Sequence, residues 1–316
     1  MSIPITIISG FLGAGKTTFL QQILKYHSDL SRILIIENDF GQVNFDTQLL
    51  GTTGVNIREL TSGCICCSLQ GDFKTALLQT LDQLDVDAIY IETSGVGKLS
   101  DILSACERSE ITAIAHVQAA ITIIDATNAP LFIRNFGEFF KDQVAHGDAL
   151  FLTHQELPEQ VELTINLLRE LNPSAPIHTE DWADINVLEY ITESLQPTVD
   201  AEETCHSDHH HEHNHECCHE HNSAHHHGNN ADHVFSTFSF TDIAPRSEEQ
   251  WANYFKDLPS TILRAKGVLP TDTGNVEIQH GLNHTNITPT ELSTIGLTVI
   301  STDIHQAELA NELCHQ

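Results

Sequence analysis

The fold of this 316-residue chain is decided by Gly10-Phe11-Leu12-Gly13-Ala14-Gly15-Lys16-Thr17. The stretch fits the pattern G-x-x-x-x-G-K-[ST], follows an isoleucine-rich run at residues 5–9 and precedes a helix-like run at residues 16–26. A strand, a glycine-rich loop and a helix in this order form a loop whose backbone N–H groups surround nucleotide phosphates. We therefore predict a P-loop nucleotide-binding domain.

Each residue type in this loop has a chemical task. Lys16 supplies positive charge to the β- and γ-phosphates, and the hydroxyl of Thr17 is suited to ligate Mg²⁺. A glycine-rich turn that binds nothing is the alternative, but the presence of both side chains in register favours a nucleotide. The predicted nucleotide-binding residues of the loop are Gly10, Gly13, Ala14, Gly15, Lys16, Thr17 and Thr18.

Two acidic residues follow strand-like runs and are candidates for the Mg²⁺ shell. Glu92 closes the run at residues 88–92, and the N–H of Gly95 in the same E-T-S-G segment is placed to sense the γ-phosphate. Asp39 follows the run at residues 33–37 and is expected to join the Mg²⁺ shell or to orient the attacking water, with an ordinary turn as the alternative. The predicted catalytic set is Lys16, Thr17, Asp39 and Glu92.

A second motif is the cysteine cluster Gly63-Cys64-Ile65-Cys66-Cys67. Thiols this close do not pair neatly as disulfides, whereas a turn at Gly63 lets Cys64, Cys66 and Cys67 face one metal ion. Zinc suits three thiolates in tetrahedral geometry and leaves a fourth position, for which Glu37 is a candidate. Cu(I), Co(II) and Ni(II) also accept thiolates, and three small buried loop residues are the alternative to a metal site.

Strand-like and helix-like runs alternate through residues 1–197, which predicts an α/β domain with a mostly parallel sheet. The expected strands are residues 5–9, 33–37, 88–92, 121–124 and 149–152. The expected helices are residues 16–26, 73–84, 98–106, 130–144 and 158–171.

A histidine-rich segment follows at residues 198–233, which lack Lys, Arg and almost all large apolar side chains. Such a segment cannot bury a core and is expected to be a disordered linker that captures metal ions. A purification tag and simple solubilising disorder are the alternatives. The candidate ligands in the linker are His209, His211, His213, His215, Cys217, Cys218, His219 and His221.

The remaining residues, 234–316, are expected to form a small α+β domain. A helix is expected near Trp251 and another at residues 306–313. The expected strands are residues 234–240, 262–268, 276–280 and 297–301.

The charge balance restricts the possible partners. The chain has 14 Lys and Arg against 44 Asp and Glu, a formal net charge of −30, which disfavours nucleic acid and acidic membrane surfaces. The first residues carry no signal-peptide pattern, and no apolar run is long enough to span a membrane, so a cytoplasmic protein is expected. In that reducing compartment clustered cysteines are expected to bind metal, while Cys106 and Cys314 are expected to be ordinary thiols.

Taken together, these motifs resemble the CobW-type metallochaperone GTPases, relatives of the accessory GTPases for urease and hydrogenase maturation. The resemblance covers nearly the whole chain and includes E-N-D-F-G from Glu37, L-N-P-S-A-P from Leu171 and R-A-K-G from Arg264. It implies GTP hydrolysis with Mg²⁺, coupled to delivery of a transition metal, zinc or cobalt, to a metal-requiring client protein. It also implies a P-loop domain followed by a CobW-type C-terminal domain, with Glu92 associated with Mg²⁺.

The resemblance also indicates where the base binds. The family usually has an N/S/T-K-x-D motif after a strand, and this chain has Thr153-His154-Gln155-Glu156 at that position. Glu156 is then expected to accept hydrogen bonds from guanine N1 and N2, while the ring of His154 covers the base. The proline usually found after E-x-x-G is replaced by Val96-Gly97-Lys98.

Two other functions fit the same motifs. A metal buffer or sensor would use the nucleotide only as a structural ligand, and would show no metal-stimulated turnover. A P-loop ATPase or kinase with an incidental zinc site would prefer ATP over GTP in a binding competition.

Overall fold

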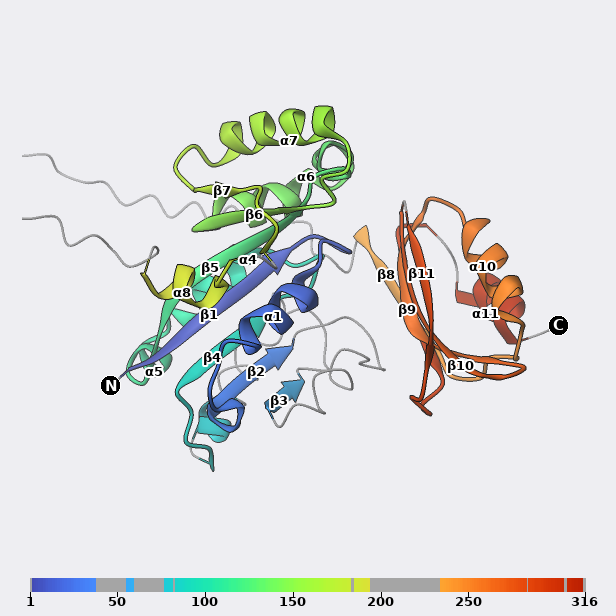
Figure 1. The fold of residues 1–316 in the computed structure, drawn as a ribbon, viewed down its shortest axis with the longest axis horizontal. Helices are drawn as coiled ribbons and strands as arrows, with labels where there is room; N and C mark the ends of the chain where they lie inside the picture. The colour runs from blue at the N-terminus through green and yellow to red at the C-terminus, as the bar shows by residue number, and fades with distance from the viewer. Residues whose placement is uncertain are drawn as a thin grey trace, which may run out of the picture.

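The computed structural model describes residues 2–37, 55–59, 77–81, 83–182, 185–193, 234–282, 284–303 and 306–314. Figure 1 shows two sheets, each with its own helices, lying side by side. Asp39, the cysteine cluster and the histidine-rich linker lie outside the described residues.

The N-terminal sheet has seven strands in the order β3-β2-β4-β1-β5-β6-β7. Every neighbouring pair is parallel. The carboxyl ends of all its strands therefore meet at one edge, where the P-loop follows β1 and Glu92 ends β4. The strands are β1 (Ile3–Gly10), β2 (Ile33–Glu37), β3 (Asn56–Glu59), β4 (Ala88–Glu92), β5 (Ala115–Asp125), β6 (Ala149–Thr153) and β7 (Ile177–His178).

Both faces of this sheet are covered, which explains why its strands read as continuous apolar runs. Ile5 and Ile7 face one cluster with Leu99 and Ile102 of the helix α4, whereas Ile8 faces another cluster on the opposite side. The helical segments of the domain are α1 (Lys16–Leu24), η1 (Leu30–Arg32), α4 (Leu99–Cys106), α5 (Ser109–Thr112), α6 (Ala129–Ala145), α7 (Pro158–Leu171) and α8 (Val187–Glu193).

The C-terminal sheet has five antiparallel strands in the order β11-β10-β9-β12-β8. Its apolar face packs on two helices through the fully buried Trp251 and Phe255, which gives this domain a core of its own. The helix that carries both residues begins with a capping box between Ser247 and Gln250. The elements are β8 (Ser236–Phe240), α10 (Glu248–Lys256), β9 (Ile262–Thr271), β10 (Gly274–Gly281), β11 (Thr285–Thr290), β12 (Gly296–Ser301) and α11 (Gln306–Cys314).

An aromatic cluster joins the two domains next to the P-loop. Phe235, which precedes β8, lies 6.4 Å from Phe11 of the P-loop and 5.4 Å from Phe139 of α6, measured between ring centroids. Leu263 and Ile300 from the C-terminal sheet are buried in the same cluster. Apolar packing therefore holds the C-terminal sheet against the phosphate-binding loop.

The predicted fold class is confirmed: a parallel α/β sheet is followed by a smaller domain with an antiparallel sheet. All five strands expected in the first domain are present, with residues 121–124 extended to the eleven residues of β5. Three strands were not predicted, namely β3, β7 and β11. The helix expected at 73–84 falls partly outside the described residues, although residues 77–81 are helical. Among the described residues, no helix combines the length and apolar character needed to cross a membrane.

Candidate nucleotide and metal site

Two glycines of the P-loop have backbone conformations in which a residue with a side chain would be strained. Gly10 has φ of +142°, and a Cβ placed there would lie 2.3 Å from the carbonyl oxygen of Ile123 on β5. Gly15 has φ of +99° and forms the N-cap of α1. These conformations favour glycine, and they bring the backbone N–H groups of the loop to the start of α1, where anions bind.

Lys16 is buried under the loop that it closes. Its Nζ donates hydrogen bonds to the carbonyl oxygens of Gly10, at 3.0 Å, and of Phe11, at 3.3 Å. The side chain is only 5% exposed and lines a cavity. These two hydrogen bonds therefore hold the ammonium group beside the predicted phosphate position.

Thr17 and Glu92 meet at the edge of the sheet. The Thr17 hydroxyl donates a hydrogen bond to Glu92 Oε1 at 3.0 Å. Hydroxyl and carboxylate oxygens are hard ligands of the kind that Mg²⁺ prefers, so this pair fits the predicted ion. Glu92 pairs with Glu37 across the neighbouring strands β4 and β2, and Glu37 is 2% exposed.

The segment after Glu92 packs directly on the P-loop. A Cβ placed at Gly95 would lie 2.7 Å from Leu12 Cδ2 and 2.9 Å from the Leu12 backbone nitrogen, so the two loops touch through their backbones. Gln143 of α6, buried beneath them, donates hydrogen bonds to the carbonyl oxygens of Gly95, at 3.3 Å, and Gly97, at 2.8 Å. Gln143 was not among the residues predicted from the sequence. A polar residue on the otherwise apolar face of α6 was the signal available.

The predicted base-reading segment is tied to the P-loop through Thr153. The Thr153 hydroxyl donates to the carbonyl oxygen of Ala14 at 3.0 Å. His154 has φ of +52°, and its carbonyl oxygen accepts a hydrogen bond from the Thr127 hydroxyl at 2.8 Å. Glu156 is exposed. The reading of guanine by His154 and Glu156 stays a prediction.

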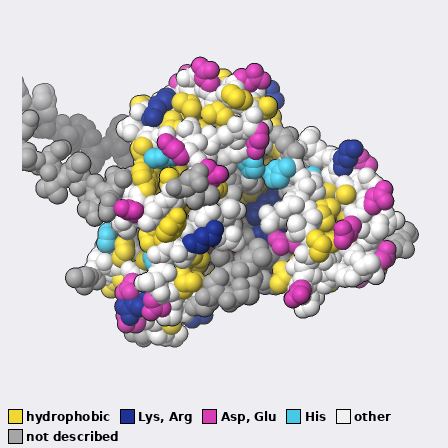
Figure 2. All heavy atoms as spheres, viewed as in Figure 1, with side chains coloured by type: hydrophobic (Ala, Val, Ile, Leu, Met, Phe, Trp, Pro, Cys, Tyr) yellow, Lys and Arg dark blue, Asp and Glu magenta, His cyan; other side chains and the backbone are white. Residues whose placement is uncertain are grey.

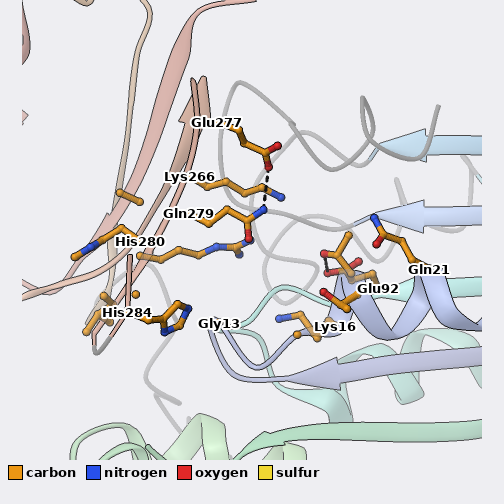
Figure 3. Close-up of a pocket in the computed structure, with 16 residues that line it drawn as sticks. Gly13, Lys16, Gln21, Glu92, Lys266, Glu277, Gln279, His280 and His284 are labelled. Carbon is orange, nitrogen blue, oxygen red and sulfur yellow. Dashed lines mark hydrogen bonds between the residues drawn. The ribbon is translucent and has the colours of Figure 1, made fainter. Parts of the chain in front are cut away.

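The two domains enclose a cavity of about 330 Å³ over the P-loop. Its floor includes Gly13, Lys16, Thr17, Thr18 and Glu92 (Figure 3). Its opposite wall comes from the C-terminal domain and includes Arg264, Lys266, Glu277, Gln279, His280 and His284. Desolvation lowers the pKa of His280 and His284, and in each case a nearby histidine lowers it further. Arg264 and Lys266 belong to the R-A-K-G motif, for which the sequence alone indicated no chemical role.

Most of the predicted metal ligands lie outside the described residues. These ligands are Cys64, Cys66, Cys67 and all the candidates in the linker. Asp39 of the predicted catalytic set also lies outside the described residues. Within the described part of the chain, no group of three or more His, Cys, Asp or Glu side chains is arranged to hold a metal ion. Cys106 is buried, which raises the pKa of its thiol to about 12 and keeps it protonated near neutral pH.

Comparisons with known proteins point to one family. A model of the CobW/HypB/UreG nucleotide-binding domain matches residues 4–179. The zinc chaperone YjiA of Escherichia coli is 34% identical over 191 residues, which are 58% of this chain and 59% of that protein. The zinc chaperone CobW of a Sinorhizobium species is 37% identical over 131 residues, 39% of this chain and 37% of that protein. The matched regions thus span less than two thirds of these relatives.

A solved structure resembles the chain over nearly its whole length. The crystal structure of Zn(II)-bound YjiA GTPase from Escherichia coli covers 98% of this chain and 97% of its own, at 21% identity and a TM-score of 0.48.

Proposed function

This chain belongs to the CobW/HypB/UreG family, and on that premise we propose that it is a GTP-hydrolysing metallochaperone. It binds one transition metal ion, zinc in the first place, at Cys64, Cys66 and Cys67 with Glu37, and transfers the ion to a client protein. The zinc chaperones among its relatives support zinc as the cargo. The motifs of the first 100 residues support the ligand set.

The observation that carries this proposal is the position of Glu37 beside Glu92. The two residues pair directly on the parallel strands β2 and β4, and neighbouring strands lie about 4.8 Å apart. Glu92 accepts the hydrogen bond from Thr17, while Glu37 is the candidate fourth ligand of the cargo ion. A movement of the Glu92 carboxylate would therefore reach the candidate cargo ligand Glu37 across a single strand spacing.

Hydrolysis is assigned to the P-loop side of the same edge. Lys16 and the loop N–H groups hold the β- and γ-phosphates, and Thr17 and Glu92 hold Mg²⁺ or its waters. Mg²⁺, when bound, neutralises charge on the phosphate oxygens. The Gly95 N–H is the predicted donor to the γ-phosphate, and it lies in the segment that packs on Leu12. Loss of that phosphate releases this segment, and with it the geometry of the cargo site.

The nucleotide is then a switch for metal affinity. Typical coupling free energies between two sites are about 1–3 kcal/mol, which change affinity roughly 5–150-fold. We expect the GTP-bound state to hold zinc more tightly than the GDP-bound state. The histidine-rich linker supplies ions to the site through weak, rapidly exchanging ligands.

A metal titration in defined nucleotide states tests the proposal. The purified apo-protein is titrated with Zn²⁺, Co²⁺ and Ni²⁺, with GDP or a non-hydrolysable GTP analogue present, while GTP turnover is followed in parallel. Glu37→Gln should weaken zinc binding, and the control Cys106→Ala should leave the zinc stoichiometry unchanged. Deletion of residues 204–227 should lower the number of bound ions and preserve turnover.

The outcomes separate the candidate functions. Equal metal affinity in both nucleotide states would contradict the proposal that the nucleotide controls metal binding. Turnover that no metal stimulates would favour the metal buffer or sensor. Displacement of GTP by an equal concentration of ATP would favour the ATPase or kinase with an incidental metal site.

A further inference from the structure

The cavity over the P-loop receives its positive charge from both domains. Lys16 lines it from the N-terminal domain, and Arg264 and Lys266 line it from β9. The chain has only 14 Lys and Arg in 316 residues, so three of them around one cavity of about 330 Å³ is a marked concentration. Figure 2 shows dark blue side chains in the hollow between the domains. Glu92 and Glu277 line the same cavity, so the three basic side chains leave a small excess of positive charge there. In a chain with a net charge of −30, this local excess favours an anion.

The architecture of β9 directs this charge to the P-loop. Residues two apart on a strand share a face, so Arg264 and Lys266 lie on one face of the sheet while Ala265 lies in the apolar core on the other. On β10, Gln279 pairs with Lys266 and continues the polar face, where it donates a hydrogen bond to Glu277. Figure 3 shows Lys266, Gln279 and Glu277 opposite Lys16 and Glu92.

A shift in strand register fixes Arg264 at this place. In the pairing of β9 with β12, Arg264 pairs with Ile300 and Ile262 with Ser301, so Leu263 is the extra residue between them. Such bulges re-aim side chains. Leu263 is 5% exposed and packs in the aromatic cluster that contains Phe11 of the P-loop. The residue next to Arg264 is thus anchored in the N-terminal domain.

Lys266 adds a second argument, because it is 7% exposed. A charged side chain is seldom buried to this degree unless charges of opposite sign accompany it. Glu277 and Glu92 line the same cavity, and a bound phosphate chain would add further negative charge between Lys266 and Lys16. The cavity volume lies in the range of small-molecule sites, which is about 300–1,000 Å³.

We propose that the C-terminal domain completes the nucleotide site: Arg264 and Lys266 bind the phosphate chain from the side opposite Lys16. In hydrolysis the water oxygen bonds to the γ-phosphorus, and the bond from that phosphorus to the β–γ bridging oxygen breaks. The diphosphate leaves with the electron pair; of the two water protons, one stays on the released phosphate and the other passes to solvent. Arg264 stabilises the charge that develops on the γ-phosphoryl oxygens, as an arginine finger supplied within one chain.

The inference rests on the proposed GTPase function, so the test measures binding as well as turnover. The affinities of the full chain for GDP and a non-hydrolysable GTP analogue are measured by calorimetry, and kcat is measured with GTP. Arg264→Ala should lower the affinity for the GTP analogue by about tenfold or more, since charge-assisted hydrogen bonds are lost. It should lower the affinity for GDP by a smaller factor, and lower kcat by about 10²–10³-fold. Arg264→Lys should recover part of the loss.

Two further variants keep the result interpretable. Lys256→Ala removes an exposed lysine from the same domain, and should leave affinities and kcat unchanged. Lys266→Met keeps most of the buried side-chain volume. It should lower the affinity for the GTP analogue, while its circular dichroism spectrum stays that of the unmodified protein. Equal analogue affinity in Arg264→Ala and the unmodified chain would overturn the inference. If Lys16→Ala also leaves nucleotide binding unchanged, the proposed function itself fails; if Lys16→Ala abolishes it, only the role of the C-terminal domain fails.

Discussion

The phosphate half and the base half of the nucleotide site differ in how firmly the fold holds them. Around the phosphates, Lys16 is buried and donates to two carbonyl oxygens, and Gly95 touches Leu12 backbone to backbone. At the predicted base position, Glu156 is exposed and His154 has a left-handed backbone conformation. The difference teaches that the predicted phosphate contacts are built into the core of the domain, whereas the predicted base contacts lie on a surface turn.

The largest effect on this comparison is expected from removing the charge of Lys16. We expect Lys16→Ala to lower the GTP hydrolysis rate by about 10²–10³-fold, since a preorganised charge at the phosphates is lost. Lys25→Ala, which removes an exposed lysine at the other end of α1, is the matched control. A rate in Lys16→Ala within a factor of two of the control would place the phosphates elsewhere.

A smaller effect is expected from a methyl group at Gly95. The new Cβ would lie 2.9 Å from the Leu12 backbone nitrogen, so the E-T-S-G segment must move away from the P-loop. Displacements of about 1 Å in catalytic groups cost roughly 10²-fold, and we expect Gly95→Ala to lose up to that much turnover. At Gly97 the closest contact would be 3.5 Å, to Ser94 O, so Gly97→Ala is the control and should keep most of its activity. Similar rates in both variants would contradict the close contact.

The base half should respond more weakly. We expect Glu156→Gln to reduce the preference for GTP over ATP by about tenfold, because one acceptor for the guanine N–H groups is lost in a position open to water. Competition between the two nucleotides for the full chain measures this preference. Glu159→Gln on the first turn of α7 tests the same change of charge without the base contact. An unchanged preference in Glu156→Gln would remove this residue from the base site.

The sequence predicted the parts of the site that lie close together along the chain, and not those that come from distant elements. The P-loop was predictable because its strand, glycines, Lys16 and Thr17 are contiguous, and each has a local chemical reason. Gln143 and Arg264 were not, because they reach the site only after α6 and β9 have packed. β11 was missed since its residues, T-N-I-T-P-T, are mostly polar and include Pro289, which is tolerated at the edge position that this strand occupies. β7 has only two residues, too few for a pattern.

The smallest expected effect is the contribution of His284, beside the predicted base position, to the pH dependence of stability. The rings of His154 and His284 lie 5.3 Å apart across the domain boundary. Desolvation and the nearby His154 lower the pKa of His284 below its usual 6.5, although Asp125 and Glu156 act in the opposite direction. As the pH falls through about 6.5, the ring of His284 therefore binds a proton more readily in the unfolded chain than in the folded one. The contribution of the neutral ring to the free energy of unfolding is complete above that pH and is lost as the pH falls.

The melting temperature of the nucleotide-free protein, measured from about pH 7.5 to about pH 5.5, tests this dependence. We expect His284→Asn to lose less stability on acidification than the unmodified chain, because its side chain does not titrate. His146→Asn, at an exposed position, should follow the unmodified chain. Parallel curves for all three proteins would mean that folding does not lower the pKa of His284, so that neither burial nor the neighbouring His154 ring acts on it at the domain boundary.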